Sequence, residues 1–429
     1  MTARTKPLEP LALDAAVFLL LALSLTVPSG YSWGAVLLLL LGLARWPAVL
    51  MGRITWPSDM RAWAIVIVLM GFVWCLHIVV DGKLITNSLG LDRSLKYLLV
   101  FLSVPALLGR RPSEAAVNWG CWIGAIGAGI TALWQVFVLG WDRAAGYTNA
   151  IQFGNLALLL AAWSGVRAMR APDVRQKAIG WLALLLGTVA SVASGSRGGW
   201  VTLPALLLLG FWFSAPPVTP AQSLPRALRA VALTLAACLV LLALPPVQQR
   251  VTIAIDEWSA AEQRPENTSV GLRRAFWEQA LAIGQAHPWI GVGQTGYEEL
   301  QREAVARRDM PEAALEFNHA HNEWLDMFAK RGLLGVAGLA LFFAVPGVLF
   351  ARRLRRDPGE PSDAVQIPDA EASARRTAAL CGLMTVLGFA GFGLTQVMFA
   401  HNNGNMMYLL TVTLWLACLQ SSPAQPVKS

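Results

Sequence analysis

Two histidines and several other polar residues gather in FNHAHNEWLD (317–326), directly before a long apolar run. His319 and His321 lie two residues apart, and Glu323 and Asp326 follow them. An imidazole near neutral pH is the usual general base. The two histidines lack the i, i+4 spacing of a helical zinc pair, so zinc is the weaker alternative. A histidine pair flanked by asparagine and Glu323 favours a general base without a metal over the simpler reading, in which the histidines only cap the helix.

Arginines in two other polar stretches could bind an anion. Arg197 is the only charged residue of SGSRGG (194–199), whose glycines let a backbone approach a ligand closely. Arg273 and Arg274 begin an amphipathic segment, where adjacent side chains point about 100° apart, so at most one faces a given site well. A guanidinium matches a phosphate with two parallel hydrogen bonds. The simpler interpretations are a turn arginine that contacts lipid phosphates and a solvated arginine pair.

The composition indicates what kind of protein positions these residues. Of the 429 residues, 55% are hydrophobic and only 14% are charged, whereas a soluble protein carries about 25% charged residues. Apolar runs of about 20 residues recur along the chain, and each is long enough to cross a bilayer as a helix. The sequence therefore predicts an all-α, polytopic membrane protein.

About twelve transmembrane helices are predicted. The tenth run is too long for one straight span, because Lys330, Arg331 and Gly332 interrupt it. The spans lie near residues 12–27, 32–50, 62–80, 95–109, 116–139, 153–169, 178–194, 198–214, 228–245, 320–350, 377–399 and 404–421.

The basic residues set the orientation of these spans. If the N-terminus is cytoplasmic, most lysines and arginines fall in cytoplasmic segments, and the short outer loops hold only Lys83, Arg93, Arg143 and Arg197. An even number of spans then places both termini in the cytoplasm. The net charge of +8 is thus mostly a topology signal, and no nucleic-acid partner is expected.

Three parts of the chain follow from this topology. Residues 1–245 hold the first nine spans, residues 246–319 form a long outer loop, and residues 320–429 hold the last three spans. Apolar residues recur at helical spacing over 271–287, and a second, more polar helix is expected over 297–309. A loop of this length with its own helices is usually functional.

Four helices that begin on the outer side have unusually polar beginnings. Helix N-termini present free N–H groups and a positive dipole end, which suits an anion such as a phosphate. No D-x-D motif occurs on the outer side, so a pyrophosphate there would be neutralised by arginine instead of magnesium. The four stretches are AGYTNAIQFGN (145–155), SGSRGGW (194–200), NHAHNEW (318–324) and HNNGN (401–405).

These motifs resemble the O-antigen ligase family, within a superfamily of O-antigen polymerases and bacterial O-oligosaccharyltransferases. SGSRGGW resembles the family's Ser-Arg-Gly turn, with Val201 where leucine is common. NTSVGLRRAFWEQAL and HPWIGVGQTGYEEL resemble the start of the large periplasmic loop, which places the family arginine on Arg273, with Arg274 beside it. HNEWLDMFAKRGLLG resembles the His-Asn motif, which places the family histidine on His321, with His319 as an unusual companion.

The resemblance implies a GT-C-like membrane fold with a large helical periplasmic loop, in the bacterial inner (cytoplasmic) membrane. It implies transfer of a glycan from undecaprenyl pyrophosphate, the donor, to a sugar hydroxyl of lipid A–core, the acceptor. The active site would face the periplasm, and both substrates would reach it from the membrane lipids. The transfer would need no cofactor and no metal, and it would invert the anomeric configuration.

The resemblance also implies a role for each candidate residue. Arg197 and Arg273, with Arg274 as a further candidate, would bind the pyrophosphate and stabilise the leaving group. His321 would accept the proton of the acceptor hydroxyl, with His319 supporting or replacing it. A carboxylate, Glu323 or Asp326, would orient the imidazole.

Three alternatives remain open on the sequence. An O-antigen polymerase would use the same donor with a growing glycan as acceptor. A protein O-oligosaccharyltransferase would glycosylate a serine or threonine of a pilin-like protein. A lipid-linked sugar transporter or flippase would be expected to carry charges midway through its spans, and spans 5, 7, 9 and 11 hold almost none.

Overall fold

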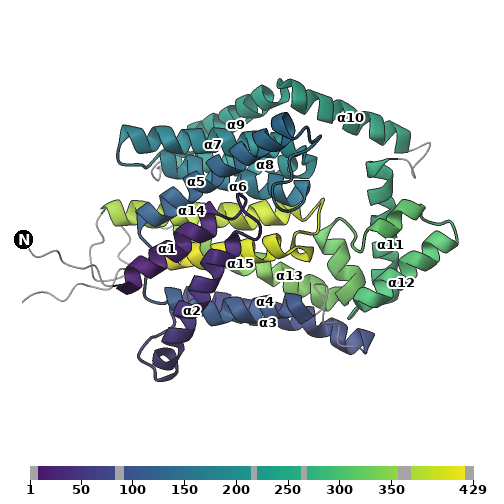
Figure 1. The fold of residues 1–429 in the computed structure, drawn as a ribbon, viewed down its shortest axis with the longest axis horizontal. Coiled ribbons are helices and arrows are strands. Elements are labelled where there is room, and N and C mark those ends of the chain that lie inside the picture. Colours follow the sequence, from purple (N-terminus) through teal and green to yellow (C-terminus); the bar gives the residue numbers. More distant parts are fainter. Residues whose placement is uncertain (1–7, 83–90, 214–219, 262–267, 356–368, 421–429) are drawn as a thin grey trace, which may run out of the picture.

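The computed structural model describes residues 8–82, 91–213, 220–261, 268–355 and 369–420, and every regular element in these ranges is helical (Figure 1). In chain order the elements are α1 (Leu8–Ala22), α2 (Tyr31–Leu50), α3 (Ser58–Asp81), α4 (Leu91–Ser103), η1 (Val104–Leu107), α5 (Glu114–Leu133), η2 (Trp134–Val138), α6 (Ala150–Ala168), α7 (Val174–Ser194), α8 (Arg197–Phe213), α9 (Pro220–Leu242), α10 (Pro245–Ala261), α11 (Ser269–Ala286), α12 (Gly293–Ala306), η4 (Glu312–Glu316), α13 (Glu323–Arg355), α14 (Asp369–Phe392), η5 (Met398–Ala400) and α15 (Asn402–Cys418).

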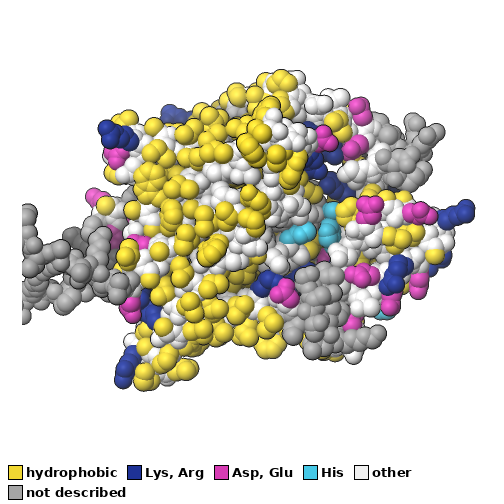
Figure 2. Space-filling model, viewed as in Figure 1, with side chains coloured by type: hydrophobic (Ala, Val, Ile, Leu, Met, Phe, Trp, Pro, Cys, Tyr) yellow, Lys and Arg dark blue, Asp and Glu magenta, His cyan; other side chains and the backbone are white. Residues whose placement is uncertain are grey.

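The helical body has the properties of an integral membrane protein. In the described ranges, six segments are long and apolar enough to cross a membrane, and they lie in α2, α3, α5 with η2, α7, α9 and α13. Apolar side chains cover the body between two ends that carry the charges (Figure 2). The prediction of an all-α, polytopic membrane protein is confirmed, and each of the twelve expected spans overlaps a described helix.

Two helices, α6 and α15, form the centre of the body and are buried along almost their whole length. Trp163 of α6 meets Trp415 of α15 edge to face, with ring centroids 5.4 Å apart. Their indole N–H groups donate to Cys381 O (3.2 Å) and to Thr385 Oγ1 (3.1 Å), both on α14. Buried indoles need such partners, so these contacts fix the three helices against one another.

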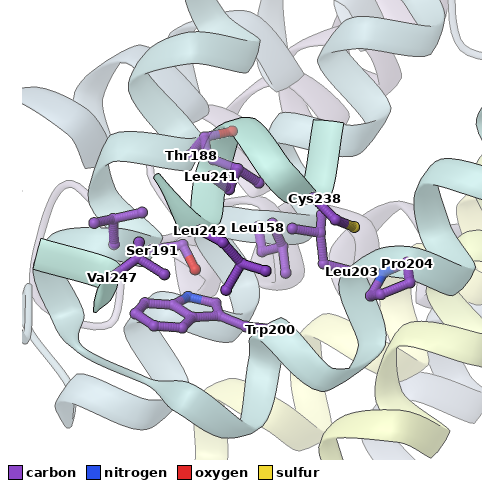
Figure 3. Close-up of a pocket in the computed structure, with 11 residues that line it drawn as sticks. Leu158, Thr188, Ser191, Trp200, Leu203, Pro204, Cys238, Leu241, Leu242 and Val247 are labelled. Atoms are coloured by element: carbon purple, nitrogen blue, oxygen red, sulfur yellow. The ribbon is translucent and has the colours of Figure 1, made fainter. Parts of the chain in front are cut away.

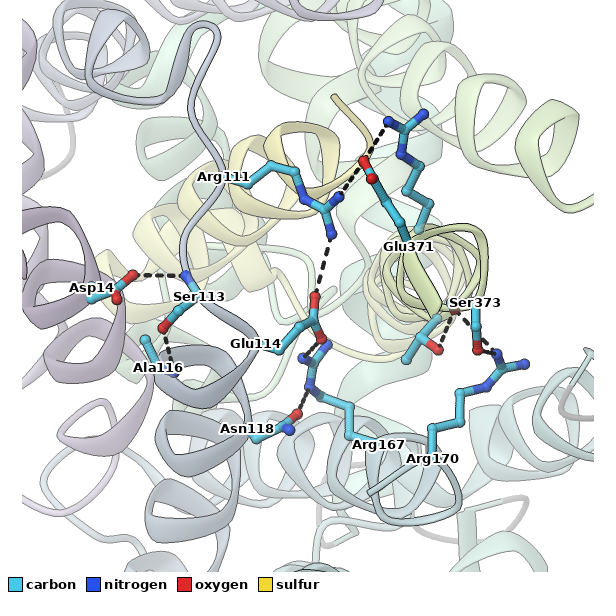
Figure 4. A network of polar contacts seen from close by, with 12 residues as sticks. Asp14, Arg111, Ser113, Glu114, Ala116, Asn118, Arg167, Arg170, Glu371 and Ser373 are labelled. Atoms are coloured by element: carbon cyan, nitrogen blue, oxygen red, sulfur yellow. Dashed lines mark hydrogen bonds and ion pairs between the residues drawn. The ribbon is translucent and has the colours of Figure 1, made fainter. Parts of the chain in front are cut away.

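An ion-paired network ties the helices together at the end of the body that holds the start of α1 (Figure 4). Arg167 of α6 is 3% exposed, and it donates to Asn118 and to Glu114 (2.6 Å) of α5. Arg111 pairs with Glu371 at the start of α14 (3.0 Å). These contacts join α5, α6 and α14 across long sequence separations.

A kink in α13 separates a buried polar entrance from the apolar part of the helix. Gly332 has φ 60° and ψ −156°, which an L-residue side chain would disfavour. The N–H groups of Leu333 and Leu334, freed by the kink, donate to Pro288 O (2.6 Å) and Trp289 O (3.2 Å). The interruption expected in the tenth run is therefore confirmed. The backbone N–H groups that it frees are hydrogen-bonded by the loop between α11 and α12, which together with these two helices forms the α11–α12 lobe.

The helices of the long loop differ in part from expectation. The helix expected over 271–287 is α11, with Phe276, Ala280 and Ile283 buried. The helix expected to begin at residue 297 begins at Gly293. The amphipathic helix α10, next to the end of α9, was not predicted, because its apolar and polar residues alternate without a long uninterrupted run.

Candidate active site

The four polar helix beginnings come together at one end of the body. Ser196, just before α8, donates to Asn155 Oδ1 of α6 (3.1 Å). Asn149, which caps α6, lies 3.5 Å from Nε2 of His401, which precedes α15. The backbone N–H of Glu323, at the start of α13, donates to the carbonyl of Gly393 (2.7 Å). The helix N-termini that the sequence placed on one face thus surround a common site.

His319 and His321 lie at the centre of this site. Their ring centroids are 4.3 Å apart, and each residue is only 8% exposed. Phe317 and Phe276 pack against His321, with ring centroids 4.9 and 5.6 Å away. Burial, together with the nearby charge of Arg273, lowers the pKa of His321 to about 4, and burial lowers the pKa of His319 well below its usual value. Both imidazoles are therefore neutral at pH 7.

Gln396 orients the ring of His321, and sequence analysis had not singled it out. The Nδ1 of His321 lies 2.8 Å from Oε1 of Gln396. Because an amide oxygen can only accept, Nδ1 carries the proton and Nε2 is left as an acceptor. His321 also has φ 50°, an uncommon value for a residue other than glycine. The surrounding structure therefore holds the backbone of His321, and with it the direction of the side chain, in a conformation that is otherwise disfavoured.

The hydrogen bonds of Glu323 and Asp326 go to loops and not to the imidazole of His321, although the charge of Asp326 acts on both imidazoles. Glu323 is 1% exposed, and its Oε2 accepts from the N–H of Phe399 (3.0 Å). Asp326 accepts from the N–H of Ala320 (3.0 Å) and pairs with Lys330 (2.7 Å). The carboxylates thus fix the two loops that carry the histidines and Gln396.

An arginine cluster, formed by Arg143, Arg197, Arg250 and Arg273, lies beside the histidines. Burial lowers the pKa of Arg273, and the charges of Arg197 and Arg143 contribute to this shift. Burial likewise lowers the pKa of Arg143, with contributions from Arg250 and Arg197. Figure 2 shows Lys or Arg side chains near the histidines, in the hollow between the apolar body and the α11–α12 lobe. Glu257 supplies one negative charge to this cluster, and an anion bound between the guanidinium groups would offset the repulsion that remains.

Local structure explains how the arginines are positioned. The π-helical turn η2 carries Gln135, whose Oε1 accepts from the N–H groups of Ala145 (2.9 Å) and Gly146 (2.8 Å) and so shapes the loop of Arg143. The guanidinium of Arg143 donates to Ser194 O (2.7 Å). Gly195 ends α7 with φ 62°, and a Cβ there would stand 3.0 Å from Nε of Arg250.

Arg197 is the first residue of α8 and has one acidic partner. Its Nη2 pairs with Glu257 Oε2 of α10 (2.9 Å), whereas its Nη1 is buried without a hydrogen-bond partner among the described residues. The neighbouring glycine serves protein packing and not ligand approach, since a Cβ on Gly198 would stand 2.0 Å from Oγ1 of Thr395. Arg197 therefore keeps a donor available inside the site.

The structure does not bring every predicted residue into the site. The side chain of Arg274 is 69% exposed and pairs with Glu278 on the same helix (2.7 Å). Arg273 is buried near Arg197 and Arg143 instead, which agrees with the expectation that at most one of the pair faces the site well. Within the described ranges, no three His, Cys, Asp or Glu side chains have the arrangement that a metal ion needs.

Two comparisons with known proteins include the part of the chain that forms this site. Residues 182–343 match the family model described as O-Antigen ligase, and this segment contains Arg197, Arg273 and His321. An uncharacterized protein of Haemophilus influenzae is 27% identical over 399 residues, which covers 90% of this chain and 92% of the relative. Residues 182–343 of this polytopic membrane protein are thus a domain of the O-antigen ligase family.

Proposed function

We propose that this protein is an O-antigen ligase, a glycosyltransferase that moves a glycan from undecaprenyl pyrophosphate to a sugar hydroxyl of lipid A–core. One observation carries the proposal above the others. A neutral, buried imidazole with an accepting Nε2, on His321, lies beside the charge of Arg273 and the rest of the arginine cluster. A base for a hydroxyl and a positive site for a leaving pyrophosphate are the two groups that this transfer requires.

The arginine cluster binds the pyrophosphate of the donor. Negative charge builds on the pyrophosphate oxygen as its bond to the anomeric carbon breaks, and fixed guanidinium groups stabilise that charge. Arg197 and Arg273 are its central members, and Arg143 and Arg250 add to them. These side chains supply positive charge where many glycosyltransferases use a divalent metal, so the transfer is proposed to be metal-independent.

His321 acts as the general base. The acceptor hydroxyl gives its proton to Nε2 while its oxygen attacks the anomeric carbon from the side opposite the pyrophosphate, which departs with the bonding electrons. One displacement of this kind inverts the configuration. The N–H of His321 lies 3.4 Å from Nδ1 of His319, so the accepting nitrogen of His319 faces the backbone and His319 supports the base. Glu323 contributes by holding the loop of Gln396.

The site faces the periplasm in the proposed topology of twelve GT-C-like spans. The basic network of Arg111 and Arg167 (Figure 4) lies at the other end of the body from the candidate site, because Arg167 is in the last turn of α6 whereas Asn149, which caps the start of α6, lies beside His401. Basic residues favour the cytoplasmic side, so this end and both termini are assigned to the cytoplasm. Residues 1–245 and 320–429 then form the membrane body in the bacterial inner membrane, and residues 246–319 form the periplasmic loop.

The test is transfer by the purified protein in excess EDTA. It is given undecaprenyl-pyrophosphate glycan together with lipid A–core, with further donor alone, or with a pilin-like protein. Glycan on lipid A–core is the expected product. Elongated donor or glycosylated protein in its place would assign the polymerase or the O-oligosaccharyltransferase reaction, and activity restored only by a divalent metal would refute the metal-independent mechanism. Movement of intact donor across vesicles without any transfer would indicate a transporter.

A further inference from the structure

Four exposed apolar side chains gather where the α11–α12 lobe rests on the kink of α13. Trp289 is 74% exposed, and Ile290, Leu333 and Leu334 are 44, 46 and 49% exposed. The N–H of Leu334 donates to Trp289 O (3.2 Å), and a Cβ on Gly332 would stand 2.4 Å from the carbonyl carbon of Trp289. The loop and the helix therefore form one rigid support for this apolar patch.

The patch continues a row of apolar side chains along α13. Leu334, Leu341 and Val348 follow one another at intervals of seven residues, which is close to two helical turns, so they lie on one face of the helix. All three are nearly half exposed. Because α13 is long and apolar enough to cross a membrane, this exposed row faces the hydrocarbon of the bilayer. Trp289, which is bonded to Leu334, extends the row beyond the kink.

The length of α13 sets the depth of Trp289 in the bilayer. Arg352 and Arg353 lie in the last turn of the helix, and charged side chains at a helix end reach the polar surface of the membrane. At a rise of about 1.5 Å per residue, the helix from Leu334 to Arg352 is about 27 Å long. Because the hydrocarbon core of a bilayer is about 30 Å thick, Leu334 and Trp289 come to its opposite boundary, where hydrocarbon meets the head groups.

Tryptophan is enriched at this boundary, because its ring is apolar and its N–H can bond to polar head groups. We propose that the loop between α11 and α12 is a bilayer anchor, in which Trp289 and Ile290 insert at the head-group level of the leaflet that faces the lobe. The anchor fixes the end of α11, near whose start Arg273 lies, at a set height above the membrane. It is independent of the proposed glycan transfer, because it uses no residue of the candidate active site. A protein partner or a second copy of the chain is the competing occupant.

Collision rates of a nitroxide label test the anchor, with the full-length protein reconstituted in vesicles of phosphatidylethanolamine and phosphatidylglycerol. The label is attached to Trp289→Cys. Oxygen concentrates in hydrocarbon and a nickel chelate concentrates in water, so the two reagents report the surroundings of the label. Leu341→Cys, in the exposed row of α13, is the reference within the hydrocarbon. Arg302→Cys, at an exposed position of α12 in the same lobe, is the matched control in water.

The label must react at one position only. Of the five native cysteines, Cys75 and Cys238 are not fully buried. Cys238 borders an apolar cavity of about 190 Å³, where a label could lodge (Figure 3). All variants are therefore made in a background in which the five cysteines are replaced by alanine.

The ratio of oxygen to nickel collisions should be several-fold higher at Trp289→Cys than at Arg302→Cys, and highest at Leu341→Cys, because the anchor lies at the boundary and Leu341 lies deeper. The same ratio at Trp289→Cys and Arg302→Cys would place the loop in water and overturn the anchor. Few collisions with either reagent would overturn it in favour of a protein contact. If Trp289→Cys does not fold, Ile290→Cys carries the label at the next position and is expected to give the same result.

Discussion

The Nδ1–H of His321 donates to Oε1 of Gln396 over 2.8 Å, and this contact joins the entrance of α13 to the loop between α14 and α15. The two residues are separated by 75 positions in the chain. The contact fixes which ring nitrogen carries the proton, so it decides which nitrogen can act as the base. Burial of the same ring keeps it neutral.

Gln396→Leu should lower kcat by about tenfold to hundredfold, because the ring of His321 loses the acceptor that fixes its tautomer. The KM for the donor should stay close to the wild-type value, since the arginine cluster is intact. Gln396→Glu keeps the accepting oxygen and should retain most of the activity. Steady-state kinetics of both variants check this, and equal losses in both would show that Gln396 is only a packing residue.

The pH dependence of kcat/KM follows from the lowered pKa of His321, which is about 4. The neutral imidazole is the base, and the lowered pKa of His321 keeps the neutral form populated down to about pH 4. The rate should therefore be level from neutral pH to about pH 5 and fall about tenfold per unit below pH 4. A circular dichroism spectrum that is unchanged at the low pH excludes unfolding as the cause, whereas a break near the usual histidine value would disprove a buried neutral base.

Glu257→Gln should lower the KM for the donor several-fold. Glu257 pairs with Nη2 of Arg197. Its carboxylate repels the pyrophosphate and occupies one of the hydrogen-bond donors of Arg197. Initial rates at varied donor concentration measure the effect. A raised KM would mean that Glu257 orients Arg197 instead of competing with the donor.

Arg143→Ala should raise the KM for the donor by about tenfold or more, because a charged hydrogen-bond donor to the pyrophosphate is lost. Arg274→Ala is the matched control, since this exposed side chain pairs with Glu278 and should leave the kinetics unchanged. The reverse result, a neutral Arg143→Ala and an impaired Arg274→Ala, would mean that the pyrophosphate binds outside the arginine cluster.

Asp326→Leu should destabilise the protein strongly, by about 3 kcal/mol or more, because it leaves Lys330 buried without its partner. Both side chains are 2% exposed. Adding Lys330→Met removes the unpaired charge and should recover much of the melting temperature in detergent. If the double variant is no more stable than Asp326→Leu alone, most of the lost stability comes from the hydrogen bond between Asp326 and the N–H of Ala320, and not from the unpaired charge of Lys330.

Local sequence patterns predicted much of the fold and part of the site. Long apolar runs identified the helices, since a membrane span needs little beyond length and composition. Polar residues before four of these runs marked the helix beginnings that surround the site. His321 and Arg197 stand out as titratable groups at two of these boundaries, whereas Arg273 was named because the loop motif resembles the O-antigen ligase family.

The remaining site residues depend on contacts that the sequence does not reveal. Gln396 is one neutral amide in a loop, and only folding brings it to His321. Arg143 and Arg250 read as ordinary loop charges until α5, α7 and α10 place them near Gly195. Glu323 was expected to orient the imidazole, but its Oε2 accepts from the N–H of Phe399 in η5.

The most direct test of the central claim is the initial rate of glycan transfer to lipid A–core by His321→Ala, at saturating donor in excess EDTA. His287→Ala is the matched histidine control, because His287 is an exposed residue at the end of α11. His321→Ala should lose at least about hundredfold in kcat, and His287→Ala should match the wild type. Transfer by His321→Ala at the wild-type rate would contradict the assignment of His321 as the base.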